Sequence, residues 1–141
     1  MGARPVKPPF KVLVVDDHKF VCEMLAHKLS TDRSVEVVGI ANHGSTAVEL
    51  ARTQHIDIVL LDMTLEQEDG IGVARQLLDV QPHIRIIGLS MHEKGHYPQT
   101  LLELGGMGFL TKRTSAREIS EAVRRVAAGN MAVSPEIAVF L

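Results

Sequence analysis

Short runs of apolar residues alternate along the chain with longer segments in which apolar residues recur every three or four positions. The first run is Val12-Leu13-Val14-Val15, and a continuous apolar run of this length is typical of a strand buried on both faces of a sheet. In the next segment the helical spacing of apolar side chains predicts an amphipathic helix over 18–30. By the same criteria we expect strands at 35–40, 56–61, 84–89 and 107–110, and helices at 45–53, 71–80, 96–104 and about 115–129.

Signals that begin and end helices support these boundaries. Pro82 closely follows the third predicted helix, and Gly105-Gly106 follows the fourth. The segment Ser115-x-x-Glu118 forms a capping box at the start of the last helix. Strands and helices that alternate across short connections build a parallel sheet with helices on both faces. We therefore predict a single α/β domain over residues 11–135, with a doubly wound, five-stranded parallel sheet.

Composition and charge narrow the class of protein. The chain has 141 residues, 45% of them hydrophobic and 23% charged, which is typical of one globular domain with a full core. A net charge of −2 gives no electrostatic basis for the binding of nucleic acid by this chain. The longest apolar run, 58–61, is too short to span a membrane, and no signal peptide pattern is present. The single cysteine, Cys22, excludes an internal disulfide and indicates a reducing, cytoplasmic location, while proline-rich residues 1–10 predict a flexible lead-in.

Polar residues follow the predicted strands at the end where the functional groups of open parallel sheets gather. Asp16 and Asp17 follow the first strand, and Asp62 follows the third. Ser90 follows the fourth strand, and Lys112 comes shortly after the fifth. Because the carboxyl ends of parallel strands meet at one edge of a sheet, we expect these side chains to converge on a single rim.

Three carboxylates on one rim require a compensating cation. Such groups repel each other by a few kcal/mol per pair at an effective dielectric constant of about 20, and burial adds a desolvation cost. All-oxygen ligands of high charge favour Mg²⁺ or Mn²⁺ over zinc. Beside such an ion, Asp62 would act as a nucleophile and form an aspartyl phosphate. Lys112 would neutralise the phosphoryl oxygens and Ser90 would hydrogen-bond one of them.

The residues at these strand ends resemble those of the response-regulator receiver domains of two-component signalling, over residues 11 to about 135. The segments that carry the resemblance are Val14-Val15-Asp16-Asp17, Leu60-Leu61-Asp62, Gly70, Leu89-Ser90 and Phe109-Leu110-Thr111-Lys112. The resemblance implies a flavodoxin-like (βα)5 fold with strand order 2-1-3-4-5. It also implies a phosphorylation-activated switch that receives its phosphoryl group from a sensor histidine kinase or a small phosphodonor.

The resemblance further implies which residues handle the phosphoryl group and the metal ion. Asp62 is the phosphoacceptor. The Mg²⁺ ligands are Asp16, Asp17, Asp62 and the backbone carbonyl of Thr64. Thr64 and His92 occupy the positions that tune dephosphorylation in the family. For His92, a solvated histidine in a loop without such a role is the plainer interpretation.

The switch residues are implied in the same way. Ser90 is the switch hydroxyl, and Lys112 is the lysine that stabilises the phosphoryl group. Phe109 stands at the position of the switch aromatic, which turns inward when the hydroxyl moves onto the phosphoryl group. That movement is expected to alter the surface formed by the fourth helix, the fifth strand and the fifth helix.

Further details resemble the NarL/LuxR-type transcriptional regulators. These details are the triplet Asp16-Asp17-His18, the glycine-rich run 105–112, and residues 127–130 before Ser134-Pro135. Regulators of this type carry a helix-turn-helix DNA-binding domain after the receiver, so residues 136–141 are expected to begin the linker to a domain that this chain lacks. We therefore expect an excised receiver rather than a stand-alone one. Its implied output is a homodimer, formed on phosphorylation, that binds promoters only through the absent domain.

Departures from the family pattern keep an alternative open. Leu65-Glu66 stand where the family usually has Met-Pro, and Glu68 and Asp69 make the rim more negative. The changed loop motivates a degenerate receiver that acts as a phosphorylation-independent interaction module. A flavodoxin-like cofactor binder is disfavoured because the acidic run 16–19 would repel a phosphate. A receiver is not an enzyme by class, since it catalyses only its own phosphorylation and dephosphorylation.

Other residues have plainer interpretations. Pro98 is expected to shorten or delay the fourth helix. Cys22 is expected to be a small packed thiol rather than a redox sensor, and the histidines to be scattered over the surface rather than gathered in a metal site. The arginines of the last helix, Arg117, Arg124 and Arg125, are expected to form a solvated face or to join a dimer contact.

Overall fold

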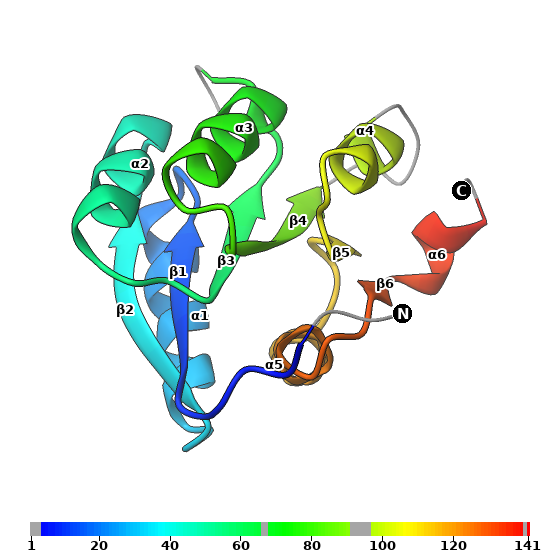
Figure 1. Ribbon diagram of the computed structural model, residues 1–141. Helices are drawn as coiled ribbons and strands as arrows, with labels where there is room; N and C mark the ends of the chain where they lie inside the picture. Colours follow the sequence, from blue (N-terminus) through cyan, green and yellow to red (C-terminus); the bar gives the residue numbers. More distant parts are fainter. Residues whose placement is uncertain (1–3, 66–67, 91–96, 140) are drawn as a thin grey trace.

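A computed structural model describes residues 4–65, 68–90, 97–139 and 141. Within these residues the chain forms a parallel sheet in the order β2-β1-β3-β4-β5-β6, with helices on both faces (Figure 1). The strands are β1 Phe10–Val15, β2 Val35–Ala41, β3 Ile58–Asp62, β4 Arg85–Ser90, β5 Gly108–Thr111 and β6 Ala132–Val133. The helices are α1 Lys19–Ser30, α2 Gly44–Thr53, α3 Gly70–Val80, α4 Tyr97–Glu103, α5 Ala116–Ala127 and α6 Pro135–Ala138.

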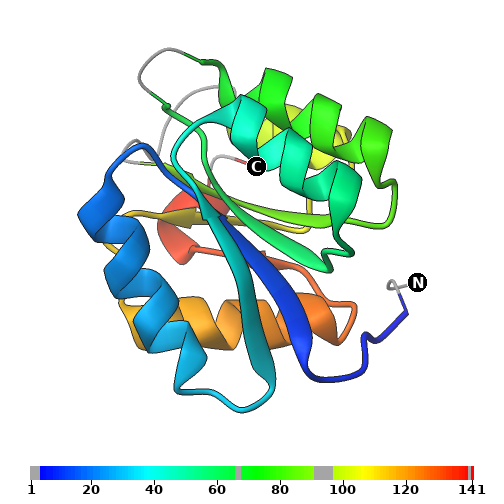
Figure 2. The ribbon, with the colours of Figure 1, turned by 90° about the vertical axis from the view of Figure 1, so that its left-hand side faces the viewer.

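The helices divide into two layers, one on each face of the sheet (Figure 2). Helices α1 and α5 cover one face, and their buried side chains join those of Val12, Val14 and Leu60 in one apolar cluster. Helices α2, α3 and α4 cover the other face, where Leu13 and Leu61 belong to a second cluster. Successive strand residues therefore enter opposite clusters, which explains why these strands are apolar without a break.

The predicted fold class and the strand order 2-1-3-4-5 are confirmed. The structure differs from the prediction in where three of the strands end. Strands β3, β4 and β5 each extend one residue further than predicted, to Asp62, Ser90 and Thr111. All three polar residues are buried. The sequence pattern ends a strand at its first polar residue, whereas backbone pairing continues to the rim, as in the 2.9 Å bond from the Lys112 amide to the Ser90 carbonyl.

A short sixth strand and a sixth helix follow α5, and neither was predicted. The chain leaves α5 through Gly129, which has a φ of 96° and so occupies the left-handed region that favours glycine. Strand β6 then pairs with β5 in parallel, and α6 buries Ile137 completely. Two residues of strand and four of helix are too short for an apolar period to reveal. Helix α6 includes part of the segment 136–141, and the role of that segment as the start of a linker stays a prediction.

The N-terminal segment is hydrogen-bonded to the domain within its described part. The Phe10 amide donates to the Ser34 carbonyl at 2.6 Å, and Phe10 is the first residue of β1. The Val6 amide donates to the Ala127 carbonyl at 2.7 Å. The predicted lead-in therefore contributes its last residue to the sheet.

Helix ends follow the sequence signals closely. Ser115 and Glu118 form the predicted capping box of α5. Helix α4 is only seven residues long, with Pro98 in its first turn, where a missing backbone N–H costs no helical hydrogen bond. This agrees with the expected shortening of the helix. Among residues 4–65, 68–90, 97–139 and 141, no helix has the length and apolarity needed to cross a membrane.

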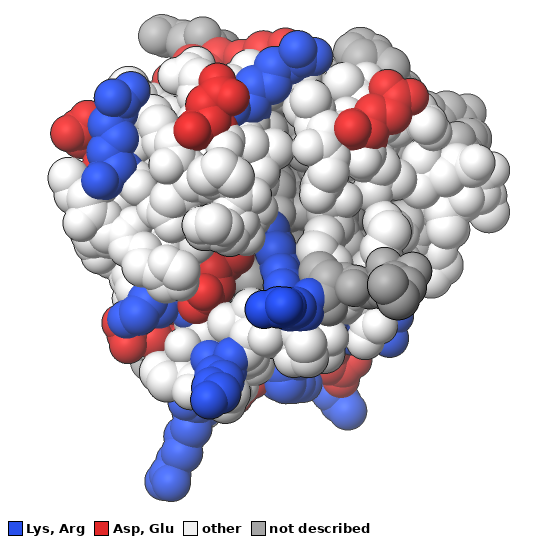
Figure 3. All heavy atoms as spheres, viewed as in Figure 1, with Lys and Arg blue, Asp and Glu red and all other residues white. Residues whose placement is uncertain are grey.

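Two arginines of α5, Arg124 and Arg125, make contacts with other parts of the chain. Arg124 Nη1 lies 2.5 Å from Asp32 Oδ2 at the end of α1, so this ion pair joins the two helices of one layer. Arg125 donates to the Met131 carbonyl at 3.1 and 2.9 Å, which ties α5 to the segment that follows it. On the face drawn in Figure 3, Lys and Arg side chains gather toward the lower edge with acidic residues interspersed among them.

Candidate functional site

Carboxylates from two neighbouring strands meet at the rim of the sheet. Asp62 is the last residue of β3 and has no exposed surface, and Asp16, directly after β1, is 3% exposed. The pairing of Val15 with Leu61 sets the two strand ends side by side. Ligand atoms of Asp16, Asp17, His18 and Asp62 all lie within 4.8 Å of one another. The predicted convergence of the three acids is therefore present.

Lys112 lies between two of these acids. Its Nζ atom is 2.9 Å from Asp62 Oδ2 and 3.0 Å from Asp16 Oδ2. Burial alone would lower the pKa of Lys112, but its bonds to Asp62 and Asp16 outweigh burial and raise the pKa above its ordinary value. Burial would likewise raise the pKa of Asp16, and the amide of His18 together with Lys112 outweighs it and holds that pKa below the ordinary value. The lysine is thus charged and the carboxylate ionised at neutral pH.

The backbone of Asp16 is fixed by two side chains from neighbouring elements. The Cys22 thiol of α1 donates to the Asp16 carbonyl at 3.1 Å, and Asn42 Nδ2 donates to the same oxygen at 2.9 Å. Burial, followed by the charge of Asp16, raises the pKa of Cys22 to about 11. Cys22 is fully buried, which agrees with its interpretation as a packed thiol. Asn42 carries no motif in the sequence, and its role was not predicted.

His18 is the second residue that sequence reasoning missed. Its Nδ1 atom lies 3.1 Å from Asp16 Oδ1 and 3.1 Å from Asp17 Oδ1, and its amide donates to Asp16 Oδ1 at 2.9 Å. His18 is exposed, as a scattered surface histidine would be, but its ring lies beside the acids of the rim. Its position next to the two acids in the sequence is the signal that could have found it.

The loop after Asp62 is anchored at both ends. The amide and hydroxyl of Thr64 donate to Asp62 Oδ1 at 2.9 and 3.1 Å. Leu65, at the position of the family's Met, is buried in the core. Further along, Glu68 Oε1 accepts from the Gly44 amide at 3.0 Å, and Asp69 caps α3 by accepting from the Ile71 amide. Glu68 and Asp69 thus hold the starts of α2 and α3, in addition to the negative charge that they bring to the rim.

The predicted switch residues lie on β4 and β5. Ser90 ends β4, is 1% exposed and pairs with Thr111, so it stands one position beyond the level of Asp62 on the neighbouring strand. Phe109 is in β5 and fully buried. It lies inward in this structure, which is the position that the family resemblance implies for the phosphorylated state. The predicted tuning residue His92 lies outside the described residues.

Gly70 allows α3 to start close to the site, and its replacement is expected to be costly. A Cβ atom at Gly70 would lie 2.6 Å from Met63 Cα and 2.8 Å from the Met63 carbonyl oxygen, so backbone would have to move. We expect Gly70→Ala to lower the free energy of unfolding by about 1–3 kcal/mol.

The matched control is Gly72→Ala in the same helix, where a Cβ atom would meet nothing within 4 Å. Its expected effect is neutral or stabilising by up to about 1 kcal/mol, because alanine is the better helix former. Urea denaturation of the two variants measures the difference. Equal stabilities for the two variants would show that the close approach at Gly70 is not needed.

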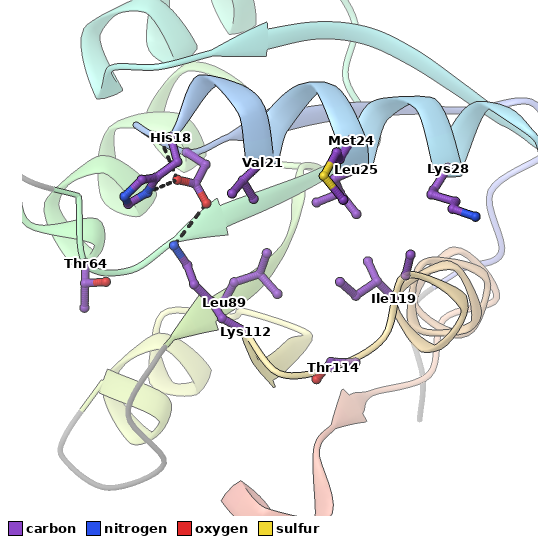
Figure 4. Close-up of a pocket in the computed structure, with 12 residues that line it drawn as sticks. His18, Val21, Met24, Leu25, Lys28, Thr64, Leu89, Lys112, Thr114 and Ile119 are labelled. Atoms are coloured by element: carbon purple, nitrogen blue, oxygen red, sulfur yellow. Dashed lines mark hydrogen bonds and ion pairs between the residues drawn. The ribbon is translucent and has the colours of Figure 1, made fainter.

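A groove of about 560 Å³ leads from the acidic rim into the space between α1 and α5. Asp16, His18, Thr64 and Lys112 line its rim end, as Figure 4 shows for the three that it labels. Beyond them the groove is lined mainly by apolar side chains, among them Val21, Met24, Leu25, Leu89 and Ile119. The groove therefore brings Asp16, at the acidic rim, next to an apolar helix surface.

A sheet in this order, with acids and a lysine at its carboxyl rim, defines the class of protein to which the chain belongs. Residues 12–124 match the response regulator receiver domain family, and the chain is a member of it. The relatives and structures that it resembles place it with the LuxR/NarL-type regulators, as the sequence motifs predicted.

Among curated relatives, the response regulator GacA of Pseudomonas aeruginosa is 36% identical over 128 residues, which cover 91% of this chain and 60% of GacA. UvrY of Escherichia coli is 32% identical over 127 residues, covering 90% of this chain and 58% of UvrY. The chain therefore spans about 60% of the length of these relatives.

Solved structures agree with this assignment. A LuxR-family two-component response regulator from Aurantimonas sp. SI85-9A1 superposes with a TM-score of 0.85 at 30% identity, covering 92% of each chain. The signal receiver domain of the putative response regulator NarL from Mycobacterium tuberculosis gives a TM-score of 0.79 at 34% identity, covering 89% of this chain and all of that one.

Proposed function

We propose that this chain is a phosphorylation-activated receiver domain in which Asp62 accepts the phosphoryl group. The observation that carries the proposal is a fully buried carboxylate with a lysine ammonium at 2.9 Å and two further acids beside it. The donor would be a sensor histidine kinase or a small phosphodonor. The only reactions catalysed would be the domain's own phosphorylation and dephosphorylation.

The proposed step is a single displacement at phosphorus. One carboxylate oxygen of Asp62 forms the new bond while the bond from phosphorus to the donor's nitrogen or oxygen breaks, and the leaving group takes a proton from solvent. Lys112 supplies a positive charge for the phosphoryl oxygens, and its bonds to Asp62 and Asp16 hold that charge in place before transfer. The Ser90 hydroxyl, at the adjacent strand end, would donate to one phosphoryl oxygen.

The residues at the rim fit a hard divalent cation. Three carboxylates face one lysine, so the site keeps an excess of negative charge, and its oxygen donors suit Mg²⁺ or Mn²⁺ rather than zinc. Asp16, Asp17, Asp62 and the carbonyl of Thr64 would hold the ion. When bound, such an ion neutralises charge on the phosphoryl oxygens. Dephosphorylation would be tuned by Thr64, which is exposed next to Asp62, and by His92.

The proposed output is homodimerisation in the cytoplasm, followed by promoter binding through a helix-turn-helix domain to which residues 136–141 would lead. The names of GacA and UvrY, and the LuxR-family structure, support a role in response regulation. Helix α1 offers an apolar surface beside the site, since Phe20 is 72%, Val21 44% and Met24 54% exposed. A contact with the kinase or with a second copy would cover that surface.

The test of this function is the intact mass of the wild-type chain after incubation with acetyl phosphate. One phosphoryl adduct is expected with Mg²⁺, and none after chelation of divalent ions. A folded chain that gains no adduct with Mg²⁺ from either acetyl phosphate or a phosphorylated histidine kinase would instead be the degenerate interaction module.

A further inference from the structure

The groove between α1 and α5 begins beside the proposed phosphoacceptor. Thr64 and Lys112 line its mouth, and both also bond to the carboxylate of Asp62. The Thr64 amide lies 2.9 Å from Asp62 Oδ1, and Lys112 Nζ lies 2.9 Å from Asp62 Oδ2. A phosphoryl group transferred to Asp62 would therefore contact the mouth of the groove, where the ammonium of Lys112 complements its negative charge.

Beyond its mouth the groove changes from polar to apolar. Three side chains of α1 point across it toward Leu89 of β4 and Ile119 of α5, namely Val21, Met24 and Leu25 (Figure 4). These three occupy helical positions i, i+3 and i+4, so they form one continuous apolar stripe along α1. The stripe ends at Lys28, roughly one helical turn further along α1.

The groove has room for a short apolar chain. Its volume of about 560 Å³ falls within the range of small-molecule sites in proteins, roughly 300–1,000 Å³. From Val21 to Lys28 the groove follows α1 for about 10 Å along the helix axis, which exceeds the length of an extended six-carbon chain. Val21 and Met24 are 44% and 54% exposed, so a ligand in the groove would remove apolar surface from water.

The exposure of the lining residues favours a slender ligand over a protein partner. Leu25, Leu89 and Ile119 are at most 8% exposed, so the little surface that they offer lies at the floor of the groove. An acyl chain is narrow enough to reach such a floor. Phe20, which is 72% exposed and is not part of the groove lining, offers the kind of surface that a protein partner would cover.

We propose that this groove binds the acyl chain of an acyl phosphate, so that the domain accepts phosphoryl groups from acyl phosphates with longer apolar chains in preference to acetyl phosphate. The inference rests on the proposed function, whose small phosphodonor it specifies. Because the attacking and leaving oxygens lie roughly in line, the acyl group points away from Asp62, where its chain can turn along α1.

The transfer step balances without a further reactant. A carboxylate oxygen of Asp62 forms the new bond to phosphorus, and the bond from phosphorus to the acyl oxygen breaks. The electron pair of that bond leaves on a fatty carboxylate, which is a stable anion at neutral pH and needs no proton. The protein thus contributes to donor choice only through its contacts with the chain.

Initial rates of phosphorylation by acetyl, butyryl and hexanoyl phosphate, with Mg²⁺ and read as intact mass of the full chain, test the inference. The three leaving carboxylates have nearly equal basicity, so the ratio of second-order rate constants reports contacts of the chain. A fully buried methylene is worth roughly a factor of four, and half burial of the four additional methylenes gives hexanoyl phosphate a rate constant about tenfold above that of acetyl phosphate. Butyryl phosphate should lie between the two.

Equal or slower reaction of hexanoyl phosphate would overturn the inference, including the case in which a second copy of the chain already covers the groove. With an adduct from acetyl phosphate, that result would leave the receiver function intact. If none of the three donors gives an adduct, the inference fails, and the receiver function is then decided by the phosphorylated histidine kinase.

Met24→Gln and Met131→Gln are a matched pair of variants that tests the groove itself. The two methionines are 54% and 47% exposed, and Met24 lines the groove, whereas Met131 follows α5 and is not part of the lining. Met24→Gln keeps the length of the side chain but places an amide in the groove, so the hexanoyl-to-acetyl ratio should fall by about threefold. Met131→Gln should keep the wild-type ratio. An unchanged ratio in Met24→Gln, or an equal fall in both variants, would show that the acyl chain does not lie in the groove.

Discussion

Asp62→Asn is expected to lose the phosphoryl adduct completely while keeping the fold. The amide of asparagine is not a nucleophile toward phosphorus at neutral pH, and no other acid of the rim occupies the end of β3. The fold should survive because asparagine has the same shape, its carbonyl oxygen still accepts from the Thr64 amide, and Lys112 keeps its bond to Asp16. Intact mass after incubation with acetyl phosphate and Mg²⁺ measures the loss, and circular dichroism checks the fold.

Asp57→Asn is the matched control for this variant. Asp57 precedes the same strand at its opposite end, where Oδ2 accepts from the Lys11 amide at 2.8 Å, an acceptor role that asparagine also fills. The Asp57→Asn chain should therefore be phosphorylated like the wild type. Residual adduct on Asp62→Asn, or its loss from Asp57→Asn, would contradict the assignment of the acceptor.

Lys112→Met is expected to be the most destabilising change at the site in the absence of divalent ions. Methionine fills a similar volume but leaves Asp16 and Asp62 buried without the ammonium that now lies 3.0 and 2.9 Å from them. Leaving buried charges uncompensated typically costs about 3 kcal/mol. Because a bound ion stabilises the state that binds it, Mg²⁺ should restore more stability to the variant than it adds to the wild type.

The pH dependence of this effect follows from the lowered pKa of Asp16. A carboxylate whose pKa is lowered on folding contributes stability above its unfolded pKa, near 3.8, and loses it as the pH falls through the folded value. The difference between wild type and Lys112→Met should therefore be full at pH 7 and shrink below about pH 4. Urea denaturation across this range, with and without Mg²⁺, measures both effects.

Lys28→Met provides the control for charge removal in the same groove. Lys28 is exposed on α1 and lines the groove away from the acids. Its replacement should change the free energy of unfolding by less than about 0.5 kcal/mol, with no dependence on Mg²⁺. Equal losses in the two lysine variants would contradict a special role for Lys112.

Much of this architecture is readable in the sequence because strands buried on both faces carry uninterrupted apolar runs. The run at 12–15 and the regular helix signals are enough to predict a parallel sheet, and the acids at strand ends then fall at one rim. Strand ends were predicted one residue early because Asp62, Ser90 and Thr111 are polar yet buried. A hydropathy pattern cannot separate a buried functional residue from the start of a loop.

The parts that escaped prediction depend on contacts between distant segments. Asn42 reaches the Asp16 carbonyl across 26 positions of sequence, and nothing local to Asn42 marks that contact. Strand β6 was not predicted because it has only two residues and its stability comes from pairing with β5, not from its own pattern. The contact of His18 was not predicted because ligand spacing on a helix face carries no information about a residue that directly follows the acids in the sequence.

The most direct test of the central claim is to locate the phosphoryl group on the wild-type chain. Borohydride reduces an acyl phosphate to an alcohol, so treatment after phosphorylation with acetyl phosphate marks the acceptor for peptide mass spectrometry. We predict that residue 62 alone is marked, and only when Mg²⁺ was present. A mark on Asp16, Asp17 or any other residue, or one that forms equally without Mg²⁺, would contradict the account.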